Sequence, residues 1–142
     1  MPQRLIAACL LAGILEAIPG SAAALDLAIE VTNPKLTSGT LYTALYNSAD
    51  GWMSTAQAMR TQKVGVQTDR TVVHYRDLPP GRYALSIYHD ENDNGRLDTN
   101  VLGIPRERTG FSSNVRGRMG PPSFEDAAVK LEQDTTLTVN LH

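Results

Sequence analysis

The chain almost completely lacks cysteine: among its 142 residues the single one is Cys9, which lies in an apolar N-terminal segment. Its surroundings, Ile6–Cys9, only superficially resemble a lipoprotein cleavage box, because almost no apolar segment precedes them. The rest of the chain can form no disulfide bond, no thiolate metal site and no cysteine nucleophile. A fold built from it depends on side-chain packing, with or without a bound ion.

A surplus of positive charge is also absent. The chain has 13 Lys and Arg against 15 Asp and Glu, a formal net charge of −2, which argues against nucleic acid as a main partner. One stretch is locally basic and contains Arg106, Arg108, Arg116 and Arg118. We interpret it as a solvated loop, and the alternative is an anion or polymer site.

Familiar catalytic motifs are missing as well. The sequence has no Gly-x-Ser-x-Gly elbow, no His-Glu-x-x-His and no phosphate-binding glycine loop. Glu91, Asp93, Glu125 and Asp126 could pair for acid–base chemistry, yet scattered surface carboxylates are the usual case. We therefore favour a protein that is not an enzyme.

Only one long apolar run occurs, Leu5 to Leu15, and it follows the positive Arg4 and precedes the small residues 21–24. This order predicts a cleaved signal peptide over residues 1–24, with cleavage after Ala23 or Ala24. The run is too short to span a bilayer permanently. We therefore expect one domain over residues 25–142, with no membrane span in the mature chain and a periplasmic or secreted location.

The mature part contains short runs in which apolar and polar residues alternate, beginning with Leu25 to Val31. Such a period of two is typical of a strand with one buried face. Further runs lie at 39–46, 64–67, 71–75, 83–87, 127–131 and 135–141, the last two as a closing hairpin, while residues 52–59 permit a short helix. About seven strands with little helix predict an all-β, two-sheet β-sandwich.

Residues 90–126 show no clear strand or helix pattern. A structureless stretch of this length inside a compact domain is usually functional or disordered. This one is too rich in apolar residues for a disordered tail, since it contains Leu97, Val101, Leu102, Ile104, Phe111 and Phe124. We predict an ordered, packed loop excursion that something must organise.

The start of this excursion has the spacing of a calcium-binding loop. Oxygen-bearing side chains stand at alternate positions in Asp90, Asn92 and Asn94, a glycine follows, and Asp98 comes at the ninth position. Calcium takes six to eight oxygen ligands in flexible geometry, including backbone carbonyls such as that of Arg96. The sequence therefore predicts a calcium site formed by Asp90, Asn92, Asn94, Arg96 and Asp98.

The match breaks at the twelfth position, where Val101 replaces a bidentate glutamate. Glu107, Glu125 or Asp126 could supply the missing carboxylate. The alternative is a metal-free turn, because Asn, Asp and Gly bond the local backbone and tolerate left-handed conformations. His89 precedes the loop, and we expect a packed strand-end histidine rather than a metal ligand.

Several motifs together resemble a known exported bacterial family, catalogued as domain of unknown function 2141. They are Leu78-Pro79-Pro80-Gly81-Arg82-Tyr83, His89 to Gly95, Leu97 to Asn100, Gly103-Ile104-Pro105, Gly110 to Asn114 and Pro122 to Ala128. The resemblance covers essentially the whole mature chain. The chain departs from the pattern at Ser113, where we expect Asn.

The resemblance implies an exported β-sandwich of immunoglobulin or transthyretin type with no assigned activity. The Leu-Pro-Pro-Gly-Arg-Tyr segment also looks like the sandwich repeats of bacterial surface adhesins. Some of these carry Asp-x-Asn-x-Asn-Gly calcium loops, a likeness at the level of the fold only. An unknown protein or glycan at the cell envelope is the partner that we expect.

Three functional hypotheses follow. In the first, calcium organises the excursion of an exported binding module, which presents Phe111, Phe124 and the edge formed by Arg106 and Arg108 to a partner. In the second, the domain is a metal-free structural or interaction module, its loop held by hydrogen bonds between side chains and backbone. The third, a hydrolase using His89 with nearby carboxylates, has the least support.

Overall fold

The computed structural model describes residues 22–32 and 35–142. Most of the predicted signal peptide, residues 1–21, lies outside the described residues. So do Asn33 and Pro34, which follow the first strand. No helix of the described part is long and apolar enough to cross a membrane.

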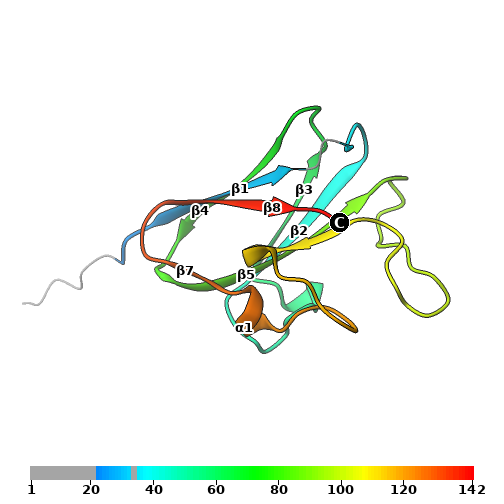
Figure 1. The fold of residues 1–142 in the computed structure, drawn as a ribbon. Helices are drawn as coiled ribbons and strands as arrows, with labels where there is room; N and C mark the ends of the chain where they lie inside the picture. The colour runs from blue at the N-terminus through cyan, green and yellow to red at the C-terminus, as the bar shows by residue number, and fades with distance from the viewer. Residues whose placement is uncertain (1–21, 33–34) are drawn as a thin grey trace, which may run out of the picture.

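The described chain forms a β-sandwich of eight strands with very little helix (Figure 1). The strands are β1 Leu25–Thr32, β2 Thr40–Tyr46, β3 Arg60–Gly65, β4 Thr71–Leu78, β5 Gly81–Asp90, β6 Thr109–Phe111, β7 Val129–Leu131 and β8 Thr135–Asn140. The helical segments are the 3₁₀ turns η1 Thr55–Gln57 and η2 Ser112–Asn114, and the single-turn helix α1 Phe124–Ala127. The predicted β-sandwich is confirmed, and its immunoglobulin or transthyretin type stays a prediction.

One sheet has three strands in the order β4-β1-β8. Alternate residues of β1 are buried, as its sequence pattern predicts, because successive side chains of a strand point to opposite faces. β1 pairs antiparallel with β4 and parallel with β8. The predicted closing hairpin is wrong: β7 pairs with β5 instead, so the last two strands lie in different sheets.

The second sheet has the order β3-β2-β5-β6, and β7 also pairs with β5. β5 is the longest strand, with 10 residues, and hydrogen-bonds to β2, β6 and β7. It begins directly after the Leu78-Pro79-Pro80 turn and ends at Asp90. The central strand of the sheet thus delivers Asp90 to one end of the sandwich.

The main hydrophobic core consists of the inward side chains of both sheets. Its fully buried members include Leu27, Ile29, Leu41, Leu45, Tyr75, Leu85, Leu131 and Val139. Burial of this apolar surface is the main favourable contribution to folding. Inside the core, the hydroxyls of Thr43 and Tyr75 lie 2.7 Å apart and share a hydrogen bond.

A second apolar cluster, around Tyr46, Phe124 and Ala127, includes residues of α1 as well as of the second sheet. The indole of Trp52 packs edge-on against the rings of Tyr46 and Phe124, and its Nε1 donates to the Pro122 carbonyl at 2.7 Å. The 47–58 connection is thereby tied to the segment before α1.

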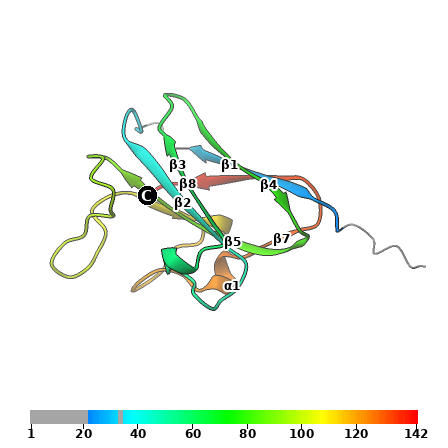
Figure 2. The same cartoon turned by 180° about the vertical axis from the view of Figure 1, so that it is seen from behind.

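The structure divides the predicted 90–126 excursion into two loops. β6 interrupts it by pairing with β5, and α1 begins at Phe124. The first loop, residues 91–108, extends beyond the ends of the strands in both views (Figures 1 and 2). The second, residues 115–123, leads from η2 to α1.

Replacing Tyr75 with Phe tests the buried hydroxyl pair. At neutral pH we expect the variant to lose about 1 kcal/mol of unfolding free energy, the usual contribution of one hydrogen bond. Burial raises the pKa of Tyr75 from 10.0 to about 12. This tyrosine therefore stabilises the fold below pH 10, and its contribution falls as the pH rises through the folded-state pKa, by about 2–3 kcal/mol.

Because the Phe variant cannot ionise, its stability should overtake that of the unsubstituted protein between pH 10 and pH 12. Urea unfolding at pH 7, 10, 11 and 12 measures both effects. Parallel stability curves for the two proteins would contradict the assignment.

Candidate functional site

The 91–108 loop begins at a fully buried carboxylate. Asp90, the last residue of β5, is 0% exposed and pairs in register with Thr40 on β2. Its Oδ1 accepts the Asn94 backbone N–H at 3.1 Å, and its Oδ2 accepts that of Gly95 at 2.7 Å. A buried charge is costly unless it is hydrogen-bonded, so Asp90 fixes the first turn of the loop.

Two glycines make room for this turn. Gly95 has a φ of +82°, a left-handed conformation that glycine adopts without steric cost. Gly39 has a φ of +90°, and a Cβ added there would lie 2.5 Å from the Asp90 carbonyl oxygen and 2.8 Å from Nε2 of His89. The connection before β2 can therefore approach Asp90 only with glycine at position 39.

A second buried carboxylate joins the two arms of the loop. Glu107 is 8% exposed, its Oε1 accepts the Glu91 backbone N–H at 2.9 Å, and its Oε2 accepts that of Asp98 at 2.9 Å. The Arg106 N–H also donates to the Asp98 carbonyl at 2.8 Å. Residues before and after the tip are thus held together, and we call Asp90, Glu107 and their backbone partners the loop neck.

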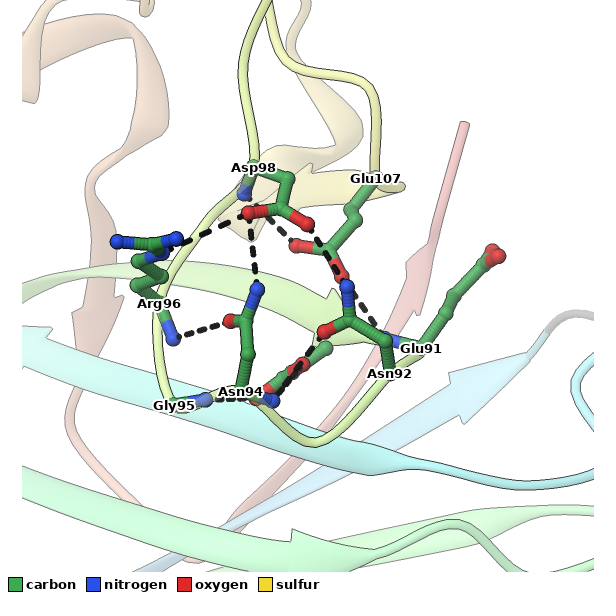
Figure 3. Close-up of polar contacts among 8 residues, drawn as sticks. Glu91, Asn92, Asn94, Gly95, Arg96, Asp98 and Glu107 are labelled. Atoms are coloured by element: carbon green, nitrogen blue, oxygen red, sulfur yellow. Dashed lines mark hydrogen bonds and ion pairs between the residues drawn. The ribbon is translucent and has the colours of Figure 1, made fainter.

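Three predicted ligands form a small polar network beside the neck, and their side chains point toward one another in Figure 3. The amide nitrogens of Asn92 and Asn94 donate to the two carboxylate oxygens of Asp98, at 2.8 Å and 2.9 Å. Their amide oxygens accept the backbone N–H groups of Asn94 and Arg96, at 3.2 Å and 3.0 Å. The polar atoms of both amides are therefore satisfied within the loop.

This network lowers the pKa of Asp98, first through the hydrogen bond from Asn94, then through that from Asn92, with Arg96 and Arg106 adding to the effect. These bonds stabilise the loop while the pH stays above the ordinary carboxyl pKa. They are lost as the pH falls through the lowered pKa of Asp98.

The structure brings together four of the five predicted ligands through their side chains, namely Asp90, Asn92, Asn94 and Asp98. The fifth, Arg96, takes part through its backbone N–H, and its exposed guanidinium lies 3.8 Å from Asp98. Of the carboxylates proposed to complete the set, only Glu107 lies at this loop. Glu125 pairs with Arg82, and Asp126 bonds Ser123 at the start of α1.

The chemistry of the network suits a hard cation only after a rearrangement. Two amide N–H groups now face the Asp98 carboxylate, where a cation would need oxygen atoms. Within residues 22–32 and 35–142, no group of three or more His, Cys, Asp or Glu side chains is placed to hold a metal ion. A cation site would need the amide oxygens of Asn92 and Asn94, together with the carboxylates of Asp98 and the neck.

The end of the loop is a small hairpin. Asn100 N–H donates to the Ile104 carbonyl at 2.8 Å, and Gly103 N–H donates to the Asn100 carbonyl at 2.9 Å. The Asn100 side-chain oxygen accepts the N–H groups of Leu102 and Ile104, at 2.9 Å and 3.0 Å. These bonds hold three apolar residues in solvent: Val101 is 101% exposed, Leu102 79% and Ile104 54%.

The predicted binding surface around the aromatic residues is wrong. Phe111 and Phe124 are buried, at 8% and 6% exposure, so neither is presented to a partner. Arg106 is exposed, whereas Arg108 pairs with Glu91 at 2.6 Å. We expected the apolar residues of the tip to be packed, and they are the ones in solvent.

His89 is packed at the end of β5, as predicted, and is 3% exposed. Its Nε2 lies 2.7 Å from the Ser38 carbonyl, which fixes this nitrogen as the donor. Its Nδ1 is buried and lies 3.5 Å from Oε1 of Glu91. Neither ring nitrogen is open to a substrate, which gives a hydrolase no support.

An open groove of about 520 Å³ runs along the outer face of the second sheet. The stacked rings of Tyr42 and Tyr88 line it, with centroids 4.8 Å apart, and the loop contributes Arg96 and Leu97. The conformation of the 91–108 loop therefore also determines the shape of this groove.

Replacing Glu107 with Gln tests the neck. The amide can accept only one of the two backbone N–H groups, and a buried donor left unpaired costs about 1–3 kcal/mol. We expect trypsin to cut after Arg96 or Arg106 at least about tenfold faster, because cleavage follows the population of the open loop. Glu125→Gln, an exposed partner of Arg82, is the matched control, and equal cleavage rates in the two variants would contradict a structural role for Glu107.

Comparison with known proteins gives one family. The model of an uncharacterised protein family conserved in bacteria, DUF2141, matches residues 29–139. No curated protein and no solved structure matches the chain. The match spans the sandwich from β1 to β8 and includes the whole 91–108 loop. The chain therefore belongs to the DUF2141 family, as its motifs had indicated.

Proposed function

We propose that this protein is an interaction module whose prebuilt 91–108 loop presents an apolar tip to a partner at the bacterial cell envelope. The loop neck carries the proposal, because two buried carboxylates fix the backbone before and after the tip. Ordering a loop in advance removes much of the entropic cost of binding. The ordered loop holds Val101, Leu102 and Ile104 in solvent, where a partner can contact them.

In this proposal the module reaches the envelope through the export signal that the sequence predicts. The order of positive, apolar and small residues in positions 1–24 supports a periplasmic or secreted location. An envelope protein, a glycan or another envelope component could then meet the tip. The exposure of its apolar residues, unusual for a domain with a well-packed core, supports a contact surface.

Retention on isolated envelope fragments from a bacterium tests the proposal. Purified domain should sediment with the fragments, and the triple variant Val101→Ser, Leu102→Ser and Ile104→Ser should lose at least about nine-tenths of that retention. Its unfolding midpoint should hardly change, because these side chains are already in solvent. Met53→Ser is the matched control, since Met53 is also exposed but lies in the 47–58 connection. Equal retention of both variants would contradict the proposal.

A second candidate role, weak calcium binding, rests on the oxygen atoms gathered at the neck. The ligands would be Asp90, Asn92, Asn94, Asp98 and the Arg96 carbonyl, with Glu107 as the missing carboxylate. Calcium would compete with the amide hydrogen bonds to Asp98, so its affinity should lie in the ~0.1–1 mM range of extracellular modules. It would neutralise carboxylates and further rigidify the loop.

Thermal unfolding in EDTA, then in calcium, with magnesium and zinc as controls, tests this role. Ligand bound only to the native state stabilises it by RT ln(1 + [L]/Kd), or about 2.7 kcal/mol at a hundredfold excess over Kd. A calcium-selective rise in midpoint should appear at about 10 mM and be absent in Asp90→Asn. No shift with any of the ions would leave the loop as a metal-free turn.

Changing the donors of the network makes the calcium test sharper. Asn92→Asp with Asn94→Asp replaces two amides that bond Asp98 by carboxylates that repel it. In EDTA the double variant should lose protection of the loop from trypsin, and calcium should restore it. Asn47→Asp with Gln133→Glu adds the same charge at exposed positions elsewhere and should show no calcium response.

A further inference from the structure

The tip, defined as Val101, Leu102 and Ile104, is convex and small. Val101 and Leu102 occupy the two central positions of the turn that the bond from Gly103 N–H to the Asn100 carbonyl closes. Their side chains are exposed to 101% and 79%. Protein partners normally cover about 800 Å² on each side of a specific interface. Three aliphatic side chains on one narrow turn provide much less than that.

Two exposed arginines flank the tip in the sequence, Arg96 and Arg106. Arg106 has no side-chain hydrogen bond or ion pair among the described residues, whereas the Arg96 guanidinium lies 3.8 Å from Asp98. The acids of the loop already have partners: Glu107 is buried against backbone N–H groups, and the Asp98 carboxylate accepts two asparagine amides beside Arg96. Glu91 pairs with Arg108, and Asp93 accepts the Thr40 hydroxyl. An approaching surface would therefore meet the aliphatic side chains first and the Arg106 guanidinium next.

The second loop, residues 115–123, repeats this combination. Met119 is 103% exposed, and Arg116 and Arg118 precede it. Neither arginine side chain has a hydrogen bond or ion pair within the part of the chain that the structure describes. No acidic residue occurs between Ser112 and Ser123. Two loops thus combine a fully exposed apolar side chain with unpaired positive charge.

We propose that the tip inserts into an anionic lipid surface, with Val101, Leu102 and Ile104 at the boundary of headgroups and acyl chains. Arg106 would then contact lipid phosphates, because arginine combines an apolar stem with a charged end. Membrane attachment of this kind adds buried apolar surface to electrostatic attraction. The inference rests on the proposed function only in requiring an ordered, exposed tip, and it does not require calcium.

Co-sedimentation with vesicles tests the inference, in EDTA and at low salt. The probes are vesicles of phosphatidylglycerol and phosphatidylcholine in equal amounts, and vesicles of phosphatidylcholine alone. We expect binding to the anionic vesicles with an association constant on the order of 10³–10⁴ M⁻¹, similar to or weaker than that of a single acyl chain. Binding to the neutral vesicles should be at least tenfold weaker, and 0.5 M salt should reduce the binding to anionic ones.

Variants separate the apolar from the electrostatic part. Leu102→Ser should lower the association constant about tenfold and Arg106→Ala about fivefold, whereas Met53→Ser and Arg82→Ala should leave it unchanged. Equal binding of Leu102→Ser and Met53→Ser would overturn the tip as the contact. Trypsin protection of the loop, measured on the same samples, shows whether each variant keeps its ordered loop.

Failure of the lipid assignment can be distinguished from failure of the proposed function. A protein that ignores both kinds of vesicle, yet is retained on envelope fragments through the tip, overturns the lipid assignment and leaves an envelope protein or glycan as partner. A protein retained on neither overturns both proposals.

Discussion

Two carboxylates buried at one end of the sandwich determine how the rest of the functional surface is arranged. Asp90 and Glu107 each accept two backbone N–H groups from the 91–108 loop. Each carboxylate thereby replaces the water that it lost on burial, and each loop amide finds a partner without a regular strand. Without these four bonds, several backbone N–H groups between positions 91 and 98 would lack a partner, and the loop would be less well ordered.

The sandwich supplies the fixed points for this arrangement. β5 is central in its sheet, and its last residue, Asp90, is held in register against Thr40 on β2. The hydroxyl of Thr40 also donates to Asp93 at 2.7 Å, which ties the start of the loop to the neighbouring strand. At the far arm, His89 N–H donates to the Arg108 carbonyl at 2.9 Å. The loop is therefore a continuation of the sheet rather than an appendage to it.

Features of the fold and the loop that depend on local sequence patterns could be predicted. The pairing of strands that are distant in the sequence could not. The alternation in β1 predicted its buried face, and the side chains of Asp90, Asn92, Asn94 and Asp98 lie together as their spacing predicted. The partners of β7 and β8 could not be predicted, because strands that are adjacent in the sequence normally pair with each other. Here β8 pairs in parallel with β1, and β7 pairs with β5.

Burial of single residues was the least predictable property. Phe111 and Phe124 fill the cores, while Val101 and Leu102 are in solvent, although all four are apolar and stand in segments without periodicity. The hydrogen bonds of Asn100 fold the tip into a hairpin that leaves Val101 and Leu102 in solvent, whereas Phe111 lies in β6 and Phe124 in α1. Glu107 was one of three carboxylates considered, and its proximity to Asp98 depends on the return path of the loop.

Amide hydrogen exchange, resolved by residue, is the most direct test of the account. If the neck organises the loop, the N–H groups of Glu91, Gly95 and Asp98 exchange at least a hundredfold more slowly than that of Val101 in the exposed turn. The protection should be present in EDTA, since the bonds of Asp90 and Glu107 need no ion. Exchange of the neck amides as fast as that of Val101 would contradict an ordered loop, and with it the presentation of the tip.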